Sequence, residues 1–583
     1  MAKPPSHSRS DESEAGGSFR GFVPGGLAAL VLGLFLTGAL TAFVHSSVLS
    51  AQAQSFDDDE FLTGNVLVQN PSWDSVARFA TEVLEPSTVS GYYAPLTMIS
   101  LMLDYALGGR PDDLTQFHRS NLGLHVLNTM ALAVLLYVLS GLLIPAMLIG
   151  LLFGLHPLSV EPIAWIAERK TLLATFFGLV GLLAYLRFAM GTLPRWRWVA
   201  LMACFFACLS KPTAVVLPVL MLTFDGWPLR RLGRNALVEK IPFFLMSASF
   251  AVVTLVSHQR TVGIEVAGEG IFASLLTACH LVVFYLTKVV WPVDLTSVYL
   301  LPDPLSLGNP TVAKGLATFL ALVVATLWLA VRGMRAPLAG GLFFVLALAP
   351  TLGGLRYSWV TASDKYVYLP GIGLAMVAVW VAARAWDSPG RGGAVARASL
   401  VAVVTVLAVT EALATRDQIT HWRDTETLYE HMLVHTPDFP LLHLNLGEMF
   451  WRSGRVEEAK RHYGRALESD PNYAKAHNNL GVLLWSTRQP RKAIEHLSRA
   501  VEIEPELAEP HRNLGIAFNG IGRFERAIRE LERALAIDAK DGQTHCAYAL
   551  SLGQLGRFAE ARKHFEESRR LVSGCTLPPG SLG

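Results

Sequence analysis

The sequence predicts an all-α protein in two parts, a polytopic membrane domain of about eleven spanning helices followed by an α-solenoid of short helical repeats. Of the 583 residues, 52% are hydrophobic and 16% are charged, whereas soluble domains carry about 25% charged residues. Apolar segments long enough to cross a bilayer recur between residues 21 and 418. From Pro440 onward the chain repeats every 34 residues, which is a period of helical repeat arrays.

These observations give four predicted regions. They are a disordered cytoplasmic N-terminus (1–20), a membrane domain (21–418) with an outer loop (49–118), a repeat domain (419–575) and a disordered tail (576–583). The net charge of +2 is too small to indicate a nucleic-acid partner. Cys204 and Cys208 lie in an apolar run and the five cysteines include no CxxC pair, so neither a zinc site nor a disulfide framework is indicated.

Loops rich in Arg and Lys are expected on the cytoplasmic side, and they test the span count. Candidate spans begin near residues 21, 122, 142, 171, 196, 212, 241, 271, 312, 338, 367 and 399. Three candidates separate the basic loops 230–240 and 332–335, yet two cytoplasmic loops require an even number of crossings. We therefore exclude the run from Ile271 to Trp291, which holds His280 and Lys288. Eleven spans place the repeats outside the cytoplasm.

The first apolar run, from about Gly21 to Val48, is interpreted as a signal anchor. It is longer than the apolar region of a usual signal peptide. A cleaved signal peptide ending near Ala51 and Ala53 is the alternative.

The repeats carry the pattern of tetratricopeptide (TPR) repeats. Leu-Gly pairs and small alanines recur in phase, at Gly447, Gly481 and Gly515, and at Ala459, Ala493, Ala527 and Ala561. Small residues let the two helices of a repeat approach closely, and stacking of repeats buries the remaining apolar faces. The product is a curved solenoid with a concave groove.

An asparagine precedes each of three Leu-Gly pairs, at Asn445, Asn479 and Asn513. An amide can donate to and accept from a peptide backbone at once. We therefore interpret the three as an acceptor-binding ladder for an extended polypeptide. The alternative is that Asn is simply common at this repeat position.

Adjacent carboxylates follow the first span, in the run Asp57-Asp58-Asp59-Glu60. Their mutual repulsion raises at least one pKa, so Asp58 or Asp59 could act as a general base or bind a divalent cation. The alternative is a solvated acidic linker. No cofactor is otherwise indicated, and no metal site beyond this pair.

Four polar residues share one face of the helix that enters the second span, namely His118, Asn121, His125 and Asn128. Polar groups at membrane depth must face protein or a water-filled cavity. A substrate role and interhelical hydrogen bonding are both open.

Five motifs then occur in a specific order. They are the segment from Leu155 to Lys170, Ser210-Lys211-Pro212, Asp225-Gly226-Trp227-Pro228-Leu229, Trp291-Pro292-Val293-Asp294-Leu295 and Asp364-Lys365-Tyr366-Val367-Tyr368-Leu369-Pro370. In this order they resemble the bacterial relatives of the transmembrane and TPR-containing O-mannosyltransferases, over about residues 20 to 570. The chain departs from that pattern at Ala94, Leu101 and Thr171.

The resemblance implies a GT-C type glycosyltransferase in a bacterial inner membrane, with a cavity open to the outer face. Such an enzyme transfers a sugar, with mannose one candidate, from a polyprenyl-phosphate donor to Ser or Thr hydroxyls of exported proteins. An acidic residue of the first outer loop serves as the base, and the matching pair here is Asp58 and Asp59. The cations we assign to the donor phosphate are Arg169, Lys170, Lys211, Arg356 and Lys365, with His156 and Glu161 completing a polar cluster.

Two alternatives remain for these features. Each cation could instead reach lipid headgroups. The whole chain could be a membrane-anchored TPR scaffold for envelope proteins, without catalysis. A scaffold would have no need to gather acids and cations around one cavity.

Overall fold

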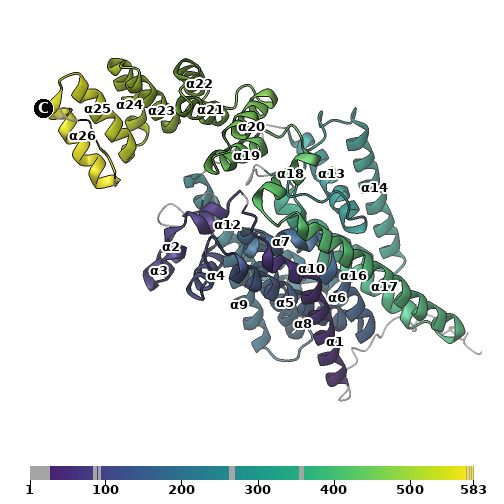
Figure 1. The fold of residues 1–583 in the computed structure, drawn as a ribbon. Coiled ribbons are helices and arrows are strands. Elements are labelled where there is room, and N and C mark those ends of the chain that lie inside the picture. The colour runs from purple at the N-terminus through teal and green to yellow at the C-terminus, as the bar shows by residue number, and fades with distance from the viewer. Residues whose placement is uncertain are drawn as a thin grey trace, which may run out of the picture. The chain divides into compact units, whose positions relative to one another are not determined.

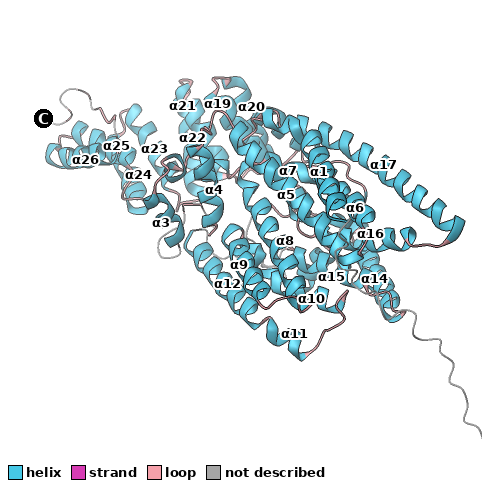
Figure 2. Cartoon of the chain, turned by 90° about the horizontal axis from the view of Figure 1, so that it is seen from below, coloured by secondary structure: helices cyan, strands magenta, loops and turns pink. Residues whose placement is uncertain are grey.

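The computed structural model describes residues 26–54, 56–82, 88–89, 93–261, 270–352, 360–572, 574–576, 578 and 581 (Figure 1). Within these residues the regular structure is helical, with two isolated bridges and no strand (Figure 2). The chain divides into two compact units, Met1–Leu428 and Tyr429–Gly583. The predicted all-α class is confirmed. The predicted disordered N-terminus and most of the tail lie outside the described residues.

The first unit holds the apolar helices. Its first half contains α1 (Gly26–His45), α2 (Val66–Gln69), α3 (Trp73–Thr81), α4 (Pro95–Ala106), α5 (Thr115–Ser140), α6 (Leu143–Leu155), α7 (Val160–Ala164), α8 (Arg169–Ala189), α9 (Arg195–Ser210) and α10 (Leu217–Gly226). Its second half contains α11 (Arg234–Glu239), α12 (Ile241–Thr261), α13 (Ile271–Val290), α14 (Pro310–Val331), α15 (Ala336–Leu348), α16 (Gly371–Trp386) and α17 (Gly390–Thr420). Helix α18 (Thr425–His435) reaches into the second unit.

Seven helices of the described chain are long and apolar enough to cross a membrane, or eight if the bent pair α6 and 157–164 forms one span. Three shorter apolar helices add to these, at Pro212–Gly226, Ala336–Thr351 and Gly371–Trp386. The chain therefore has the helices of a membrane protein. Helix α13, which the parity count excludes, is one of the seven, so its length and composition give no reason to exclude it. The count of eleven spans and the orientation stay predictions.

Small residues set the closest helix approach in this unit. A Cβ atom on Gly340 of α15 would lie 2.4 Å from the carbonyl oxygen of Gly373 in α16, and the reverse distance is also 2.4 Å. The two backbones therefore touch, as small residues allow between membrane helices. Around this contact α5, α6, α8, α9, α10, α15 and α16 share one apolar core.

The second unit is the predicted repeat array, and it forms four helix pairs. They are α19 (Pro440–Arg452) with α20 (Val456–Ser469), α21 (Ala474–Ser486) with α22 (Pro490–Ile503), α23 (Ala508–Gly520) with α24 (Phe524–Ile537), and α25 (Gly542–Gln554) with α26 (Phe558–Leu571). A Cβ on Gly447 would lie 2.4 Å from the Tyr463 ring, and one on Gly481 would lie 2.7 Å from Leu497. The glycines that recur at this spacing thus have the packing role that the sequence predicts.

One prediction about the cysteines is wrong. Cys546 and Cys575, 29 residues apart, form a disulfide in the repeat unit, although the cysteine spacing did not indicate one. The pair has no local CxxC spacing and joins two segments only through the fold. The free cysteines of the described chain, Cys204, Cys208 and Cys279, all lie in the first unit.

Candidate functional site

Helix α8 begins with the polar residues Arg169-Lys170-Thr171, which follow Glu168, although most of the rest of the helix is apolar. The side chains of Glu168 and Lys170 are 1% and 2% exposed. Ionised groups are costly to bury unless they are paired. Each of these charges must therefore have a partner, and the partners define the site.

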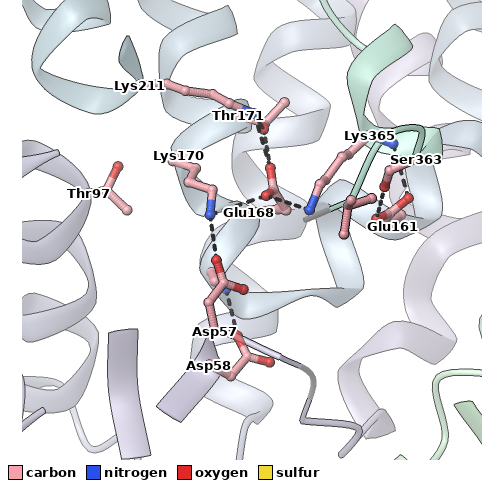
Figure 3. Close-up of polar contacts among 12 residues, drawn as sticks. Asp57, Asp58, Thr97, Glu161, Glu168, Lys170, Thr171, Lys211, Ser363 and Lys365 are labelled. Atoms are coloured by element: carbon pink, nitrogen blue, oxygen red, sulfur yellow. Dashed lines mark hydrogen bonds and ion pairs between the residues drawn. The ribbon is translucent and has the colours of Figure 1, made fainter. Parts of the chain in front are cut away.

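Glu168 contacts three lysines from three different segments (Figure 3). One carboxylate oxygen lies 3.3 Å from Lys170 Nζ and 3.2 Å from Lys365 Nζ. The other lies 3.3 Å from Lys211 Nζ and also accepts a hydrogen bond from the Thr171 hydroxyl. Lys211 in turn donates to Thr171 Oγ1 at 2.6 Å. We call Glu168, Lys170, Lys211, Lys365 and Thr171 the Glu168 cluster.

The loop elements around α8 place the two distant lysines. Lys211 follows the last residue of α9, whose carbonyl oxygen accepts a 2.9 Å hydrogen bond from Thr97 of α4. Lys365 lies in the turn η7 (Asp364–Val367), and its backbone N–H donates to Glu161 of α7 at 3.0 Å. The Lys365 ammonium also sits 3.5 Å from the centre of the Trp165 ring, a favourable cation–π position.

Glu161 therefore holds the turn η7 in place through hydrogen bonds. Its second carboxylate oxygen accepts from Ser363 Oγ at 2.7 Å. In the same loop, burial and the neighbouring Glu161 raise the pKa of the Asp364 carboxyl well above its usual value. Tyr299 donates to Asp364 at 2.7 Å, so the loop that carries Lys365 is held from two sides.

The acidic run after α1 contributes one carboxylate to the cluster. Asp57 Oδ2 lies 2.9 Å from Lys170 Nζ, and Asp57 Oδ1 is buried with no hydrogen-bond partner among the described residues (Figure 3). Asp58 is buried, and its Oδ1 accepts from the backbone N–H of Ala167 at 2.9 Å. Asp59 is exposed and accepts from Thr63 at 2.6 Å. The three neighbours thus have different partners in the described part of the chain, and Asp57 is the one that pairs with Lys170 there.

A small cavity of about 30 Å³ borders the cluster. Its polar lining includes Lys211, Lys365, Thr171 and Thr175, and its apolar lining includes Ala174, Ala214, Leu217, Ala347 and Leu369. A cavity of this size holds about one or two water molecules. A larger group enters only if the lysine side chains move apart.

One of the five predicted phosphate-binding cations, Arg169, is not part of this arrangement. Arg169 is fully buried and points away, to Asp104 at 2.6 Å, to the carbonyl of Phe117 at 2.8 Å and to Asn121. Its N–H donors bond to groups in α4 and α5 and so hold these two helices against α8. Arg356 lies outside the described residues. Lys170, Lys211 and Lys365 come together as predicted.

The polar face of α5 makes hydrogen bonds between helices. Asn121 donates to the Ile163 carbonyl at 3.0 Å, and Asn128 donates to the Leu172 carbonyl at 3.0 Å. His125 contacts Tyr368 at 2.7 Å and the Gly154 carbonyl at 3.0 Å. His118 contacts the Ala51 carbonyl at 3.1 Å. Of the two readings that the sequence left open, these contacts support interhelical bonding.

His156 has a similar local role. Its Nδ1 accepts from the Leu158 N–H at 3.2 Å, and its Nε2 contacts the Val289 carbonyl at 3.0 Å. The residue therefore caps the turn η3 (Pro157–Ser159) and ties it to α13.

No group of three or more His, Cys, Asp or Glu side chains in the described part of the chain is arranged to hold a metal ion. Asp58 and Asp59 in particular direct their carboxylates to different partners. A divalent cation needs several oxygen ligands converging on one point. This pair does not offer them.

The asparagines of the repeats face the preceding helix of the array. Asn479 donates to Glu448 at 2.7 Å, Asn513 to Asn478 at 2.9 Å and Asn445 to Tyr429 at 3.4 Å. All three remain partly exposed. Each side chain therefore also makes a contact between helices, because neighbouring helices of the array lie close enough to share hydrogen bonds.

Sequence reasoning missed Asp57, Glu168, Ser363 and Thr171 as members of the site. The available signal was the position of Glu168 next to Arg169 and Lys170 at the start of a span. A lone carboxylate at the buried end of an apolar helix needs cations, and lysines are present in two other motifs.

Comparison with known proteins identifies the repeats of the second unit. A family model described as tetratricopeptide repeat matches residues 444–508, 483–544 and 512–574. Protein O-mannosyl-transferase tmtc2 of Xenopus laevis is 25% identical over 213 residues, which are 35% of this chain and 25% of the frog protein. The chain is a TPR-containing protein that resembles this O-mannosyl-transferase family. The aligned part spans about a quarter of the frog protein's length.

Three solved structures are also similar to part of the chain. They are MamA (22% identity, 24% of this chain and 84% of that chain, TM-score 0.23), the TPR protein YrrB (18%, 24% and 74%, TM-score 0.23) and PilF of Pseudomonas aeruginosa (20%, 26% and 68%, TM-score 0.25).

The cluster predicts a large effect for Glu168→Gln. The substitution is nearly isosteric but leaves three buried ammonium groups without their shared anion, and breaking a buried ion pair in this way typically costs about 3–5 kcal/mol. We expect a lower unfolding temperature in detergent. The exposed Glu506→Gln should have no effect. Adding Lys211→Met to Glu168→Gln should restore part of the loss, and a Glu168→Gln protein as stable as the parent would show that the lysines do not depend on Glu168.

Proposed function

We propose that this chain is a membrane glycosyltransferase of GT-C type that transfers a sugar from a polyprenyl-phosphate donor to Ser or Thr hydroxyls of exported proteins. The observation that carries the proposal is the Glu168 cluster beside Asp57. Three lysine ammonium groups from three segments meet there around one buried carboxylate, and Asp57 pairs with one of them. Charge-assisted contacts from such a group of lysines suit a phosphate.

A prenyl-linked phosphate fits the surroundings of these lysines. Lys211 and Lys365 line the cavity together with aliphatic side chains of α8, η5 (Pro212–Val216), α10 and α15. The lysines supply the charge that a phosphate needs, and the aliphatic wall suits a hydrocarbon chain. The cavity is too small to hold the donor phosphate in the present arrangement. Donor binding therefore requires the lysines to move away from Glu168.

Asp57 is the carboxylate best situated to act as the base. Its Oδ1 lacks a hydrogen-bond partner in the described chain, whereas Oδ2 is paired with Lys170. In the proposed reaction the acceptor hydroxyl oxygen bonds to the sugar C1 while the bond from C1 to the phosphate oxygen breaks. The hydroxyl proton passes to Asp57, and the electron pair leaves with the lipid phosphate, which the lysines stabilise.

Lys170 links the two halves of this reaction. It lies between Glu168 and Asp57, so a phosphate that attracts Lys170 also weakens its pairing with Asp57. The base is thereby released when the donor is bound. Asp58 supports the arrangement by fixing the acidic run to the backbone just before α8.

Substitutions of the acidic run separate these roles. Asp57→Asn should lower transfer from a labelled polyprenyl-phosphate sugar by about 10²- to 10⁴-fold, the usual loss on removing a positioned base. Asp58→Asn keeps an oxygen that can accept the Ala167 N–H and should lose less. Asp59→Asn is the matched exposed control. Full transfer by Asp57→Asn, together with loss in Asp58→Asn or Asp59→Asn, would assign the base to the pair suggested by the sequence alone.

For the second unit we propose that the repeats bind the acceptor polypeptide. The ladder of Asn445, Asn479 and Asn513 lies at one position of three successive first helices and stays partly exposed. Each side chain uses its amide N–H within the array, and the carbonyl oxygens of Asn479 and Asn513 accept from Asn478 and Arg512. An amide oxygen has two lone pairs, so each can receive a further N–H from an extended peptide.

Truncating the three asparagines to Ala tests this assignment. Lost hydrogen bonds of about 0.5–1.5 kcal/mol each should weaken acceptor-peptide binding by one to two orders of magnitude. Binding of the lipid-linked donor should not change. Because the amides also bridge repeats, a modest fall in unfolding temperature is expected, and Gln543→Ala serves as the exposed control. Unchanged peptide affinity would remove the ladder from acceptor binding, and peptide binding without any donor chemistry would favour the scaffold.

We further propose that the chain lies in a bacterial inner membrane with the repeats outside the cytoplasm. The parity of the basic loops supports this side. The donor site would then open to the same outer face as the loop that carries Asp57, where exported acceptors are available.

A further inference from the structure

The segment after α26 turns back onto α25, the first helix of the last repeat. Cys575 is bonded to Cys546 of α25. A Cβ atom on Gly553 would lie 2.0 Å from the carbonyl oxygen of Ser581, and one on Gly542 would lie 2.6 Å from Val572. Ser581 is 2% exposed. The segment therefore contacts α25 near its start, its middle and its end.

Repeat geometry identifies the face of α25 that is covered. In the second repeat, Asn478 accepts from Asn513 of the next first helix at 2.9 Å. Trp485 packs on Gly520 of the same helix, where a Cβ would lie 2.2 Å from the indole ring. Asn478 and Trp485 thus mark the face on which the following repeat stacks.

Two repeat periods of 34 residues later, the equivalent positions are Cys546 and Gly553. These are the two residues that Cys575 and Ser581 contact. The C-terminal segment therefore stands where the first helix of a fifth repeat would stack. A repeat array leaves an apolar stacking face at its end and needs a cap there for solubility.

We propose that the described residues that follow α26, among them Val572, Cys575 and Ser581, form the cap of the repeat array and that the Cys546–Cys575 disulfide locks this cap in place. The lock closes the stacking face to further repeats, including those of a second copy of the chain. This inference concerns the repeat unit alone and does not depend on the proposed sugar transfer.

The lock also assigns the unit to an oxidising compartment. Forming it removes the two thiol protons, and the two electrons reduce the disulfide of a dithiol oxidant to two thiols. Such oxidants keep disulfides formed in the periplasm and outside cells, whereas the cytosol keeps thiols reduced. Both cysteines lie in the repeat unit, and the three free thiols lie in the membrane unit.

Thiol labelling of the full-length chain in its native membrane tests the lock. In a Cys204→Ala, Cys208→Ala, Cys279→Ser background only Cys546 and Cys575 remain. After acid quenching, a maleimide mass tag should add to neither cysteine, and two tags should add after reduction. Two tags without reduction would overturn the lock and the compartment assignment.

Tryptic cleavage after Arg569 and Arg570, followed by mass spectrometry, tests the cap. Cys575→Ser should be cleaved at least about ten-fold faster, because removing a disulfide from a small unit costs much of its local stability. Gly553→Leu displaces Ser581 without altering a cysteine and should also be cleaved faster. Gly464→Leu is the matched control, since its Cβ meets nothing within 4 Å. Cleavage of both test variants at the parent rate would show that the segment is no cap.

Discussion

The membrane unit depends on one buried anion. Glu168 holds Lys170, Lys211 and Lys365 together, and each lysine belongs to a different part of the chain. Without Glu168, uncompensated charges would be buried at three places. These are the first turn of α8, the break between α9 and η5, and the turn η7. The carboxylate therefore fixes three segments and collects the cations that an anionic ligand needs. Stability and proposed function rest on the same contacts.

The sequence pattern predicted those parts of the fold that depend on residues near one another in the chain. The apolar runs and the 34-residue period gave the helices because spacing along the chain decides both. The Cys546–Cys575 disulfide was missed because its partners meet only when the last repeat folds back. The number of spans is harder, because helices such as Pro212–Gly226 and Ala336–Thr351 are shorter than a bilayer crossing requires and the sequence does not reveal how neighbours complete them.

The site was predictable in composition and less so in geometry. Lys170, Lys211 and Lys365 lie in separate motifs, and their shared charge suggested one anion site. The sequence could not tell which carboxylate of the acidic run faces them, because consecutive residues point in different directions and the turn at 56–63 decides the outcome. Arg169 shows the same limit: on a helix it faces away from its neighbour Lys170, and Asp104 neutralises it.

The most direct test of this account is equilibrium binding of a polyprenyl phosphate to the purified chain, measured by native mass spectrometry in detergent. The account predicts binding by the parent and a loss of at least about ten-fold in affinity for Lys211→Met or Lys365→Met, since each removes a charge-assisted contact worth roughly 1.5–3 kcal/mol. Arg169→Lys keeps a buried cation beside Asp104 and should bind like the parent. Equal binding by all four proteins would contradict the claim that the Glu168 cluster is an anion site.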